Sequence, residues 1–319
     1  MKCSTYTSTI CLLCVLLLPP PHAGHAGKMK SAHSFLNKFS FSAGLGYLEG
    51  KSDEFVFDEG AGRKLSELNW DIESAAIIKG AIQFDALPWL TLTASGWNTL
   101  NKGNAILDDY DWLNPSQAEW SDWSHHENTQ LRYANEFDLS VTGWVLDKEH
   151  YKLGLMGGYN RSTVSYLSVG GCFIYGGGSA IGCFPENQIG IGYQQKFNTG
   201  YVGLTGSYFI NKWDVNALFK YGPSVNAKDV DQHYQRSLTF KEKGHGADFY
   251  SFSLTSGYKI HSDLRVFLEG VYNQFDHQKA DTTIINHNTN TLSRINNSAG
   301  LSYTNYMVSL GIQYNPAMS

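Results

Sequence analysis

The sequence predicts an all-β protein, a transmembrane antiparallel β-barrel of about ten strands with long extracellular loops. Three observations lead to this fold class. Of the 319 residues, 17% are charged and 14% aromatic, and Gly occurs 32 times. From Phe39 onward, apolar and polar residues alternate with the period of a β-strand. Short and long connections also alternate along the chain, as they do between the strands of outer-membrane barrels.

The composition argues against several other classes. Disordered chains are poor in aromatic residues and rich in charge, and a polytopic helical membrane protein needs several apolar runs of about 20 residues. A formal net charge of −5 lacks the basic excess of a nucleic-acid-binding protein, so no nucleic-acid partner is expected. A soluble β-sandwich would also alternate, but without the regular succession of short and long connections.

The first 26 residues have the features of an export signal. Lys2 provides a positive start, and the apolar run 10–18 is too short to span a bilayer and is followed by three prolines. Gly24-His25-Ala26 resembles a cleavage site, so we expect removal of residues 1–26 and a mature barrel of residues 27–319.

Strands are expected wherever the alternation persists, with the segment 188–210 forming one long strand. Runs of alternation occupy 39–47, 78–85, 90–95, 137–143, 151–155, 202–208, 213–221, 250–254, 264–268 and 306–314. Short turns are expected near 86–88, 147–149, 211–212 and 260–263. Long polar loops are expected near 51–72, 99–131, 167–187, 223–246 and 275–300.

Aromatic residues near the expected strand ends are candidates for the girdles of a membrane barrel. They are Tyr47, Trp70, Trp89, Trp97, Trp144, Tyr208 and Tyr258.

Two cysteines remain in the mature chain, Cys172 and Cys183, within the Gly-rich segment 167–187. Cysteines close in sequence in an exported protein pair more often than they react. We therefore expect a small loop disulfide.

The first motif with chemical potential is Asp108-Asp109-Tyr110-Asp111-Trp112. On a strand, Asp109 and Asp111 point to the same side. Two carboxylates at this spacing repel each other unless they share a proton, a cation or a hydrogen-bonded water. A solvated acidic surface is the alternative interpretation.

The second motif is Asp229-Val230-Asp231-Gln232-His233. Strand spacing places Asp229, Asp231 and His233 on one face. A carboxylate beside an imidazole fixes its tautomer and raises its basicity, so the pair could activate water. Acid-rich loops also bind Ca²⁺ or Mg²⁺, and an added His could suit Zn²⁺. From spacing alone these alternatives stay open.

The chain resembles the omptins, a family of outer-membrane aspartyl-type endopeptidases of Gram-negative bacteria. Specific stretches that carry the resemblance are Gly62–Leu68, Ala75–Ile82, Thr129–Leu131, Tyr133–Leu139, Leu153–Met156, Tyr201–Tyr208, Asp109-Tyr110-Asp111-Trp112 and Asp231-Gln232-His233-Tyr234. The resemblance implies a ten-stranded barrel in the outer membrane with an active-site groove at its extracellular end.

The resemblance also implies roles for individual residues. His233 would be the general base and Asp231 would orient it. Asp109 and Asp111 would position the water and stabilise the tetrahedral intermediate. Asp122 and His126 match positions that support activity in the family. No metal and no other cofactor is implied.

The expected substrates are peptides and host proteins that carry basic residues. Glu54 and Asp229 match the family positions that receive a substrate Lys or Arg, which acidic side chains attract. The natural substrate, and how strictly basic residues are required, do not follow from the sequence.

Lipopolysaccharide is the expected activator, and the outer membrane the expected location of a monomeric protein. Basic side chains on the outer barrel wall would hold the lipid phosphates. Lys196 stands where the family has Arg, and neutral Thr163 stands at another such position. Arg161 lies two residues away on the same face, with Tyr159 next along it.

Two other functions are compatible with a barrel. A non-catalytic surface adhesin or lipopolysaccharide-binding barrel would use the same long connections. A diffusion porin is disfavoured, because about ten strands enclose little free lumen once side chains fill it.

Overall fold

The computed structural model describes residues 35–59 and 62–316. The predicted signal segment 1–26 lies outside them. Within the described ranges, no helix is long and apolar enough to cross a membrane.

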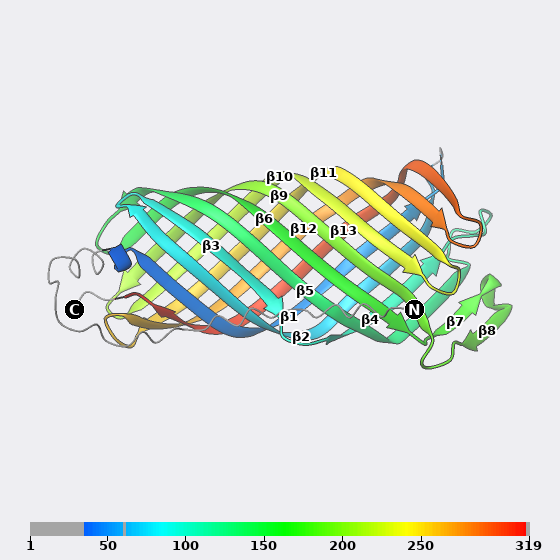
Figure 1. Cartoon of the computed structure of the whole chain (residues 1–319), viewed down its shortest axis with the longest axis horizontal. Helices are drawn as coiled ribbons and strands as arrows, with labels where there is room; N and C mark the ends of the chain where they lie inside the picture. Colours follow the sequence, from blue (N-terminus) through cyan, green and yellow to red (C-terminus); the bar gives the residue numbers. More distant parts are fainter. Residues whose placement is uncertain (1–34, 60–61, 317–319) are drawn as a thin grey trace, which may run out of the picture.

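The chain folds into a closed ring of ten antiparallel strands, with β3 and β4 sharing one position between β2 and β5 (Figure 1). The fold class is therefore confirmed. The ring strands are β1 (Phe39–Phe57), β2 (Lys64–Leu87), β3 (Leu90–Thr99), β4 (Gly103–Asp111), β5 (Asp122–Asp147), β6 (Tyr151–Val169), β9 (Ile189–Ile210), β10 (Trp213–His233), β11 (Leu238–Lys259), β12 (Leu264–Asn286) and β13 (Thr291–Tyr314).

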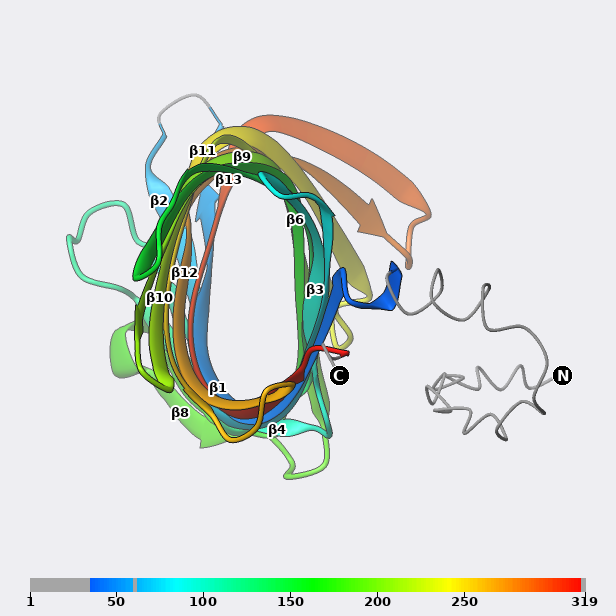
Figure 2. The same ribbon diagram turned by 90° about the vertical axis from the view of Figure 1, so that its left-hand side faces the viewer.

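The first and last strands close the barrel. β1 pairs with β13 from Phe41↔Tyr314 to Val56↔Ala299, and β1 also pairs with β2. Closure leaves no free ring edge for another chain to pair with. Seen along the barrel, the ring is an elongated oval rather than a circle (Figure 2). Opposite walls therefore approach each other across the short diameter.

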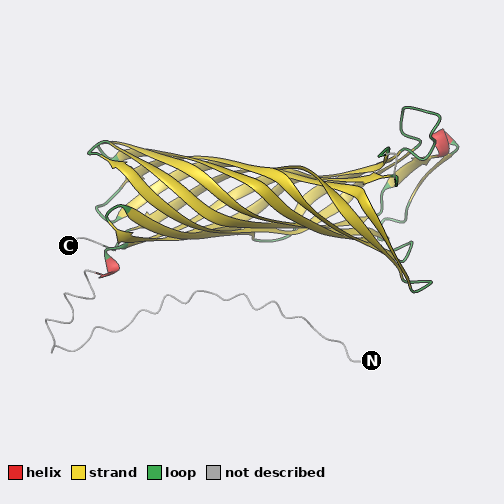
Figure 3. Cartoon of the chain, turned by 90° about the horizontal axis from the view of Figure 1, so that it is seen from above, coloured by secondary structure: helices red, strands yellow, loops and turns green. Residues whose placement is uncertain are grey.

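The strand prediction was right in kind and too short in length. The segment 188–210 is the single strand β9, and tight turns separate β2 from β3, β5 from β6, β9 from β10 and β11 from β12. Most residues of the expected long loops instead extend the strands, so β10 runs to His233 and β11 begins at Leu238. The extended strands are seen along the length of the barrel in Figure 3. These polar segments continue the backbone ladder of the barrel, as expected for a wall that rises above the bilayer into water.

Alternation in the membrane portion places apolar side chains outward. Leu45, Tyr47, Val308 and Leu310 are all exposed on the outer wall, while their chain neighbours alternate inward. Among the girdle candidates, Tyr47, Trp89 and Tyr208 are exposed and Tyr258 is half-buried, which is compatible with a girdle; their level in the membrane stays a prediction.

The girdle prediction was wrong for three tryptophans. Trp70 and Trp97 are buried in the barrel interior, and Trp144 donates from Nε1 to Thr91 Oγ1 at 2.9 Å inside it. Position near a strand end does not specify the face. The strand phase does, and all three share the inward phase.

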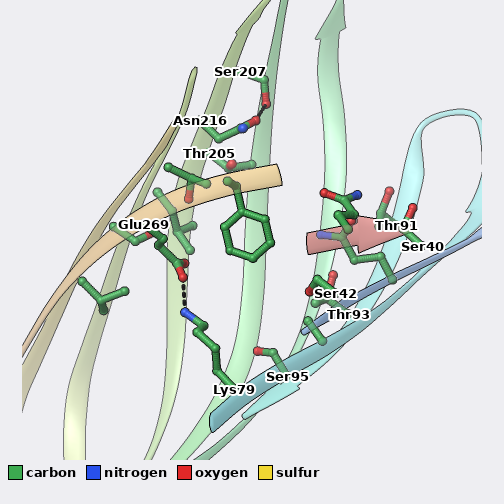
Figure 4. A pocket seen from close by; sticks show the side chains of 18 of the residues that line it. Ser40, Ser42, Lys79, Thr91, Thr93, Ser95, Thr205, Ser207, Asn216 and Glu269 are labelled. Atoms are coloured by element: carbon green, nitrogen blue, oxygen red, sulfur yellow. Dashed lines mark hydrogen bonds and ion pairs between the residues drawn. The ribbon is translucent and has the colours of Figure 1, made fainter. Parts of the chain in front are cut away.

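The interior has two zones. Toward the end with the long connections it is filled by rings, with Trp70 stacked on Tyr166 and Tyr193 at centroid distances of 5.2 and 5.0 Å. Phe197, Phe249, Phe275 and Tyr303 continue this layer. Toward the short turns lies a polar cavity of about 540 Å³, where Lys79 pairs with Glu269 (Figure 4). The ring layer fills the lumen, as expected for a small barrel.

Candidate active site

The two acidic motifs lie on opposite walls of the barrel, at the end with the long connections. Asp109 and Asp111 are on β4, and Asp231 and His233 are on β10. β5, β6 and β9 separate these strands around the ring. Nevertheless His233 is close enough to act electrostatically on both Asp109 and Asp111, where its charge offsets part of the rise in pKa that burial causes. The fold thus brings together the residues that sequence reasoning had paired.

Asp231 and His233 form a close pair. Nε2 of His233 lies 2.6 Å from Oδ2 of Asp231, and the His233 ring packs edge-on against Phe240. Burial lowers the pKa of His233, but the charge and hydrogen bond of Asp231 outweigh it, so the pKa is raised overall. Asp231 thereby favours the imidazolium form and fixes the ring.

Asp109 and Asp111 are held beside Ser66 on β2. Ser66 Oγ donates to Asp109 Oδ1 at 3.2 Å. Burial, reinforced by the charge of Asp111, raises the pKa of Asp109 to about 7. Burial also raises the pKa of Asp111, against the opposing hydrogen bond from Ser66. At neutral pH such a pair retains a proton part of the time, so it can donate a hydrogen bond as well as accept one.

Asp122 and His126 anchor a hairpin that adds to the edge of β5. This hairpin consists of β7 (Cys172–Tyr175), β8 (Ala180–Cys183) and the turn η1 (Gly176–Gly178). Asp122 Oδ1 accepts from the Gly176 backbone N–H at 3.0 Å. His126 contacts the Gly170 carbonyl through Nδ1 at 2.6 Å and Ser124 Oγ through Nε2 at 3.0 Å. Burial lowers the pKa of His126, so the neutral ring is favoured.

A disulfide joins Cys172 to Cys183 at the base of this hairpin, with an S–S distance of 2.07 Å. The two cysteines are also register partners in the β7–β8 ladder. Asp122 and His126 bind the two ends of this disulfide-linked hairpin, at Gly176 in its turn and at Gly170 beside its base, so their observed contacts are structural.

Glu54 and Asp229 lie together although their strands are not neighbours. A third acid, Glu242 on β11, joins them, and the carboxylate oxygens of the three residues lie within 4.8 Å of one another. All are buried, with exposed fractions of 2% for Glu54, 4% for Asp229 and 3% for Glu242. We call Glu54, Asp229 and Glu242 the acidic triad.

Glu242 is the residue that sequence reasoning missed. It lies between two lysines, in a segment expected to be a loop. The signal was available in the hairpin register, because the short turn after His233 sets Glu242 opposite Asp229.

The proposed lipid-facing residues gather on the outer wall. Arg161, Thr163 and Lys196 line a hollow of about 370 Å³, together with Tyr133, Asn135 and Phe137. Thr163 and Lys196 are direct register partners. Tyr159 lies outside this set and donates from Oη to Asn198 Oδ1 at 2.9 Å.

Fold and site define a class of protein, a ten-stranded membrane barrel with a buried, carboxylate-rich site at one end. The model of the Omptin family matches residues 35–315. The plasminogen activator of Yersinia pestis is 42% identical over 279 residues, covering 87% of this chain and 89% of that one. Protease 7 of Escherichia coli O157:H7 is 40% identical over 278 residues, covering 85% and 88%. The crystal structure of the outer membrane protease OmpT from Escherichia coli matches with a TM-score of 0.84 at 38% identity, covering 86% of this chain and 96% of that chain.

The chain therefore belongs to the omptin family. It is a protease located in the outer membrane, built as a β-barrel. The predicted family, fold, location and peptidase activity are confirmed at this level.

Proposed function

We propose that this protease hydrolyses peptide bonds beside or between basic residues, using a water molecule activated between the Asp109–Asp111 pair and His233. The observation that carries the proposal is the electrostatic interaction between His233 on β10 and the Asp109–Asp111 pair on β4. His233 is held by Asp231 at 2.6 Å, and its charge acts on both carboxyls of the pair on β4. A base, its orienting carboxylate and a proton-holding acid pair thus occur in one site.

In the proposed reaction, His233 is the general base. Nε2–H donates to Asp231, which leaves Nδ1 to take a proton from the water. The water oxygen then bonds to the peptide carbonyl carbon. His233 returns the proton to the leaving nitrogen as the C–N bond breaks, giving a carboxylic acid and an amine. Asp109 and Asp111 hold the water, and their shared proton stabilises the developing oxyanion.

The acidic character of the site supports the preference for basic substrates. Glu54 and Asp229 are buried near the catalytic pair, and Asp229 lies two residues from Asp231 on the same strand face. A substrate cation is attracted to such a cluster of carboxyl groups, and its charge in turn favours their ionised form. Cationic peptides and exposed basic segments of host proteins are the substrate class that follows.

Lipopolysaccharide is proposed as the activator, bound on the outer wall. The hollow lined by Arg161 and Lys196 offers two cations suited to lipid phosphates, one of them a bidentate guanidinium. Tyr159 would flank this site. The protein is proposed to act as a monomer that needs no metal and no other cofactor.

The test is cleavage of a dibasic peptide by purified protein with lipopolysaccharide. Asp109→Ala, Asp111→Ala and His233→Ala should each abolish cleavage while the barrel stays folded, and Asp147→Ala at a short turn should not. Activity should survive a strong chelator, because side chains alone hold the water. Full activity of folded His233→Ala would contradict the mechanism. A non-catalytic adhesin is disfavoured by membership in a protease family.

A further inference from the structure

The acidic triad contains one residue that the proposed function does not require. Glu54 and Asp229 come from the family resemblance, whereas Glu242 enters only through the fold. Asp229 and Glu242 are direct partners in the β10–β11 ladder, and the Glu242 backbone N–H donates to Asp229 Oδ1 at 3.1 Å. Glu54 reaches the same point from β1, which β11, β12 and β13 separate from β10.

Two carboxylate oxygens of the acidic triad are buried away from water and lack a hydrogen-bond donor among the described residues. Oε2 of Glu54 and Oε2 of Glu242 are buried and have no hydrogen-bond partner. The other oxygen of Glu242 accepts from Thr282 Oγ1 at 3.1 Å, and Asp229 Oδ2 accepts from Tyr193 Oη at 3.1 Å. Buried acceptors without donors are unfavourable. A proton shared between Glu242 and Asp229 could satisfy one side of the site, whereas the Glu54 oxygen has no donor among the described residues and suits a ligand that donates hydrogen bonds.

No cationic side chain of the described residues forms an ion pair with any member of the triad. The Lys and Arg ion pairs of residues 35–59 and 62–316 all involve other acids. Burial, together with the charges of neighbouring acids, raises the pKa of Glu54 and Glu242 well above the usual range and that of Asp229 to about 7. Burial and mutual repulsion thus disfavour three bare carboxylates at this point, and a proton or a bound cation relieves both.

The distances between the carboxylate oxygens of the acidic triad indicate which kind of cation fits between them. Three oxygens within 4.8 Å of one another leave a central point no more than about 2.8 Å from each, the length of a charge-assisted N–H···O bond. An ammonium presents three donors around one nitrogen. A guanidinium spreads five donors over three nitrogens in a plane, which suits a single carboxylate edge rather than a central point.

We propose that Glu242 is a specificity-determining residue that, with Glu54 and Asp229, encloses the ammonium group of a substrate lysine. This inference rests on the proposed function, since it assigns one substrate side chain to the acidic site of that protease. It predicts that the protease cleaves a substrate with Lys at least as well as one with Arg, at the substrate position whose side chain enters the acidic triad.

The experiment compares two peptides that differ only in Lys or Arg at the cleaved position. Full-length protein with lipopolysaccharide is used, and kcat/KM is measured for each peptide. Glu242→Gln keeps the shape and removes the charge, so it should lower the Lys-to-Arg ratio of kcat/KM by about tenfold, as expected on losing a hydrogen bond to a charged group. Glu242→Asp should restore part of the ratio. Glu149→Gln, at a short turn, is the matched control.

Failure takes distinguishable forms. If the parent cleaves both peptides and folded Glu242→Gln leaves their ratio within twofold, Glu242 does not set specificity and only this inference falls. If the parent cleaves neither peptide, the proposed function itself falls. Inhibition of both peptides by millimolar Ca²⁺ in the parent but not in Glu242→Gln would assign the triad to a divalent cation and overturn the lysine assignment. Competition by acetyl-lysine amide over acetyl-arginine amide, lost in Glu242→Gln, would support it independently of turnover.

Discussion

Nε2 of His233 lies 2.6 Å from Oδ2 of Asp231, two residues earlier on the same strand. Because alternate residues of a strand share a face, the sequence alone places the two side chains side by side. The proposed chemistry of this pair also depends on β4, where the charge of His233 acts on the carboxyl groups of Asp109 and Asp111.

The first prediction concerns the orientation of the general base. Asp231→Asn keeps the side-chain shape but removes the charge that fixes the His233 tautomer. We expect kcat for a dibasic peptide to fall by about 10³-fold or more, as in other enzymes whose base loses its orienting carboxylate. Asp147→Asn, far from the site, should keep full activity. A fall of less than tenfold would show that Asp231 does not orient the base.

The second concerns pH. His233 must be neutral to accept a proton, and its pKa is raised above 6.5 because Asp231 outweighs burial. The charges of Arg236 and Asp109 act on it as well, in opposite directions. We expect kcat/KM to decrease as pH falls through the neutral range, because His233 becomes protonated. Asp231→Asn should move this decrease to lower pH, which residual activity and NMR titration of His233 would both report.

The third concerns stability. Burial raises the pKa of Glu54 well above its unfolded value, so folding takes up a proton between those two values. The free energy of unfolding therefore declines as pH rises through that window. Glu54→Gln removes the effect and should raise the thermal unfolding temperature at pH 8, with the gain vanishing near pH 4.

Thermal unfolding in detergent, followed by circular dichroism, measures this difference. Glu149→Gln should show no gain at either pH. A Glu54→Gln variant that is less stable than the parent at pH 8 would mean that Glu54 is ionised and paired in the folded protein.

The fourth concerns the disulfide hairpin. β7 pairs with β5 only from Trp123 to His125, so the hairpin contributes little to the barrel ladder. Replacing both Cys172 and Cys183 by Ser should speed hydrogen exchange in residues 170–186 while leaving barrel unfolding unchanged. Asp122→Ala should act in the same direction because it removes the acceptor for the Gly176 N–H. Slow exchange in both variants would show that the hairpin needs neither anchor.

Sequence by itself determined the parts of this protein that depend on local periodicity. Alternation from Phe39 predicted the strands and their outward apolar face, and the spacing of Asp231 and His233 predicted that these two side chains form a pair. Length of the strands was underestimated, because polar residues on a solvated wall resemble loop residues. Trp70, Trp97 and Trp144 were misplaced because a strand end does not reveal which face a ring occupies.

Only the tertiary structure decided which walls meet. Three strands separate β1 from β10 in the ring, yet Glu54, Asp229 and Glu242 share one buried point inside it. Contacts between strands that are not neighbours in the ring depend on the barrel's cross-section, which no local pattern encodes. Glu242 shows the limit, since its partner Asp229 was recognisable from sequence whereas its own place required the β10–β11 register.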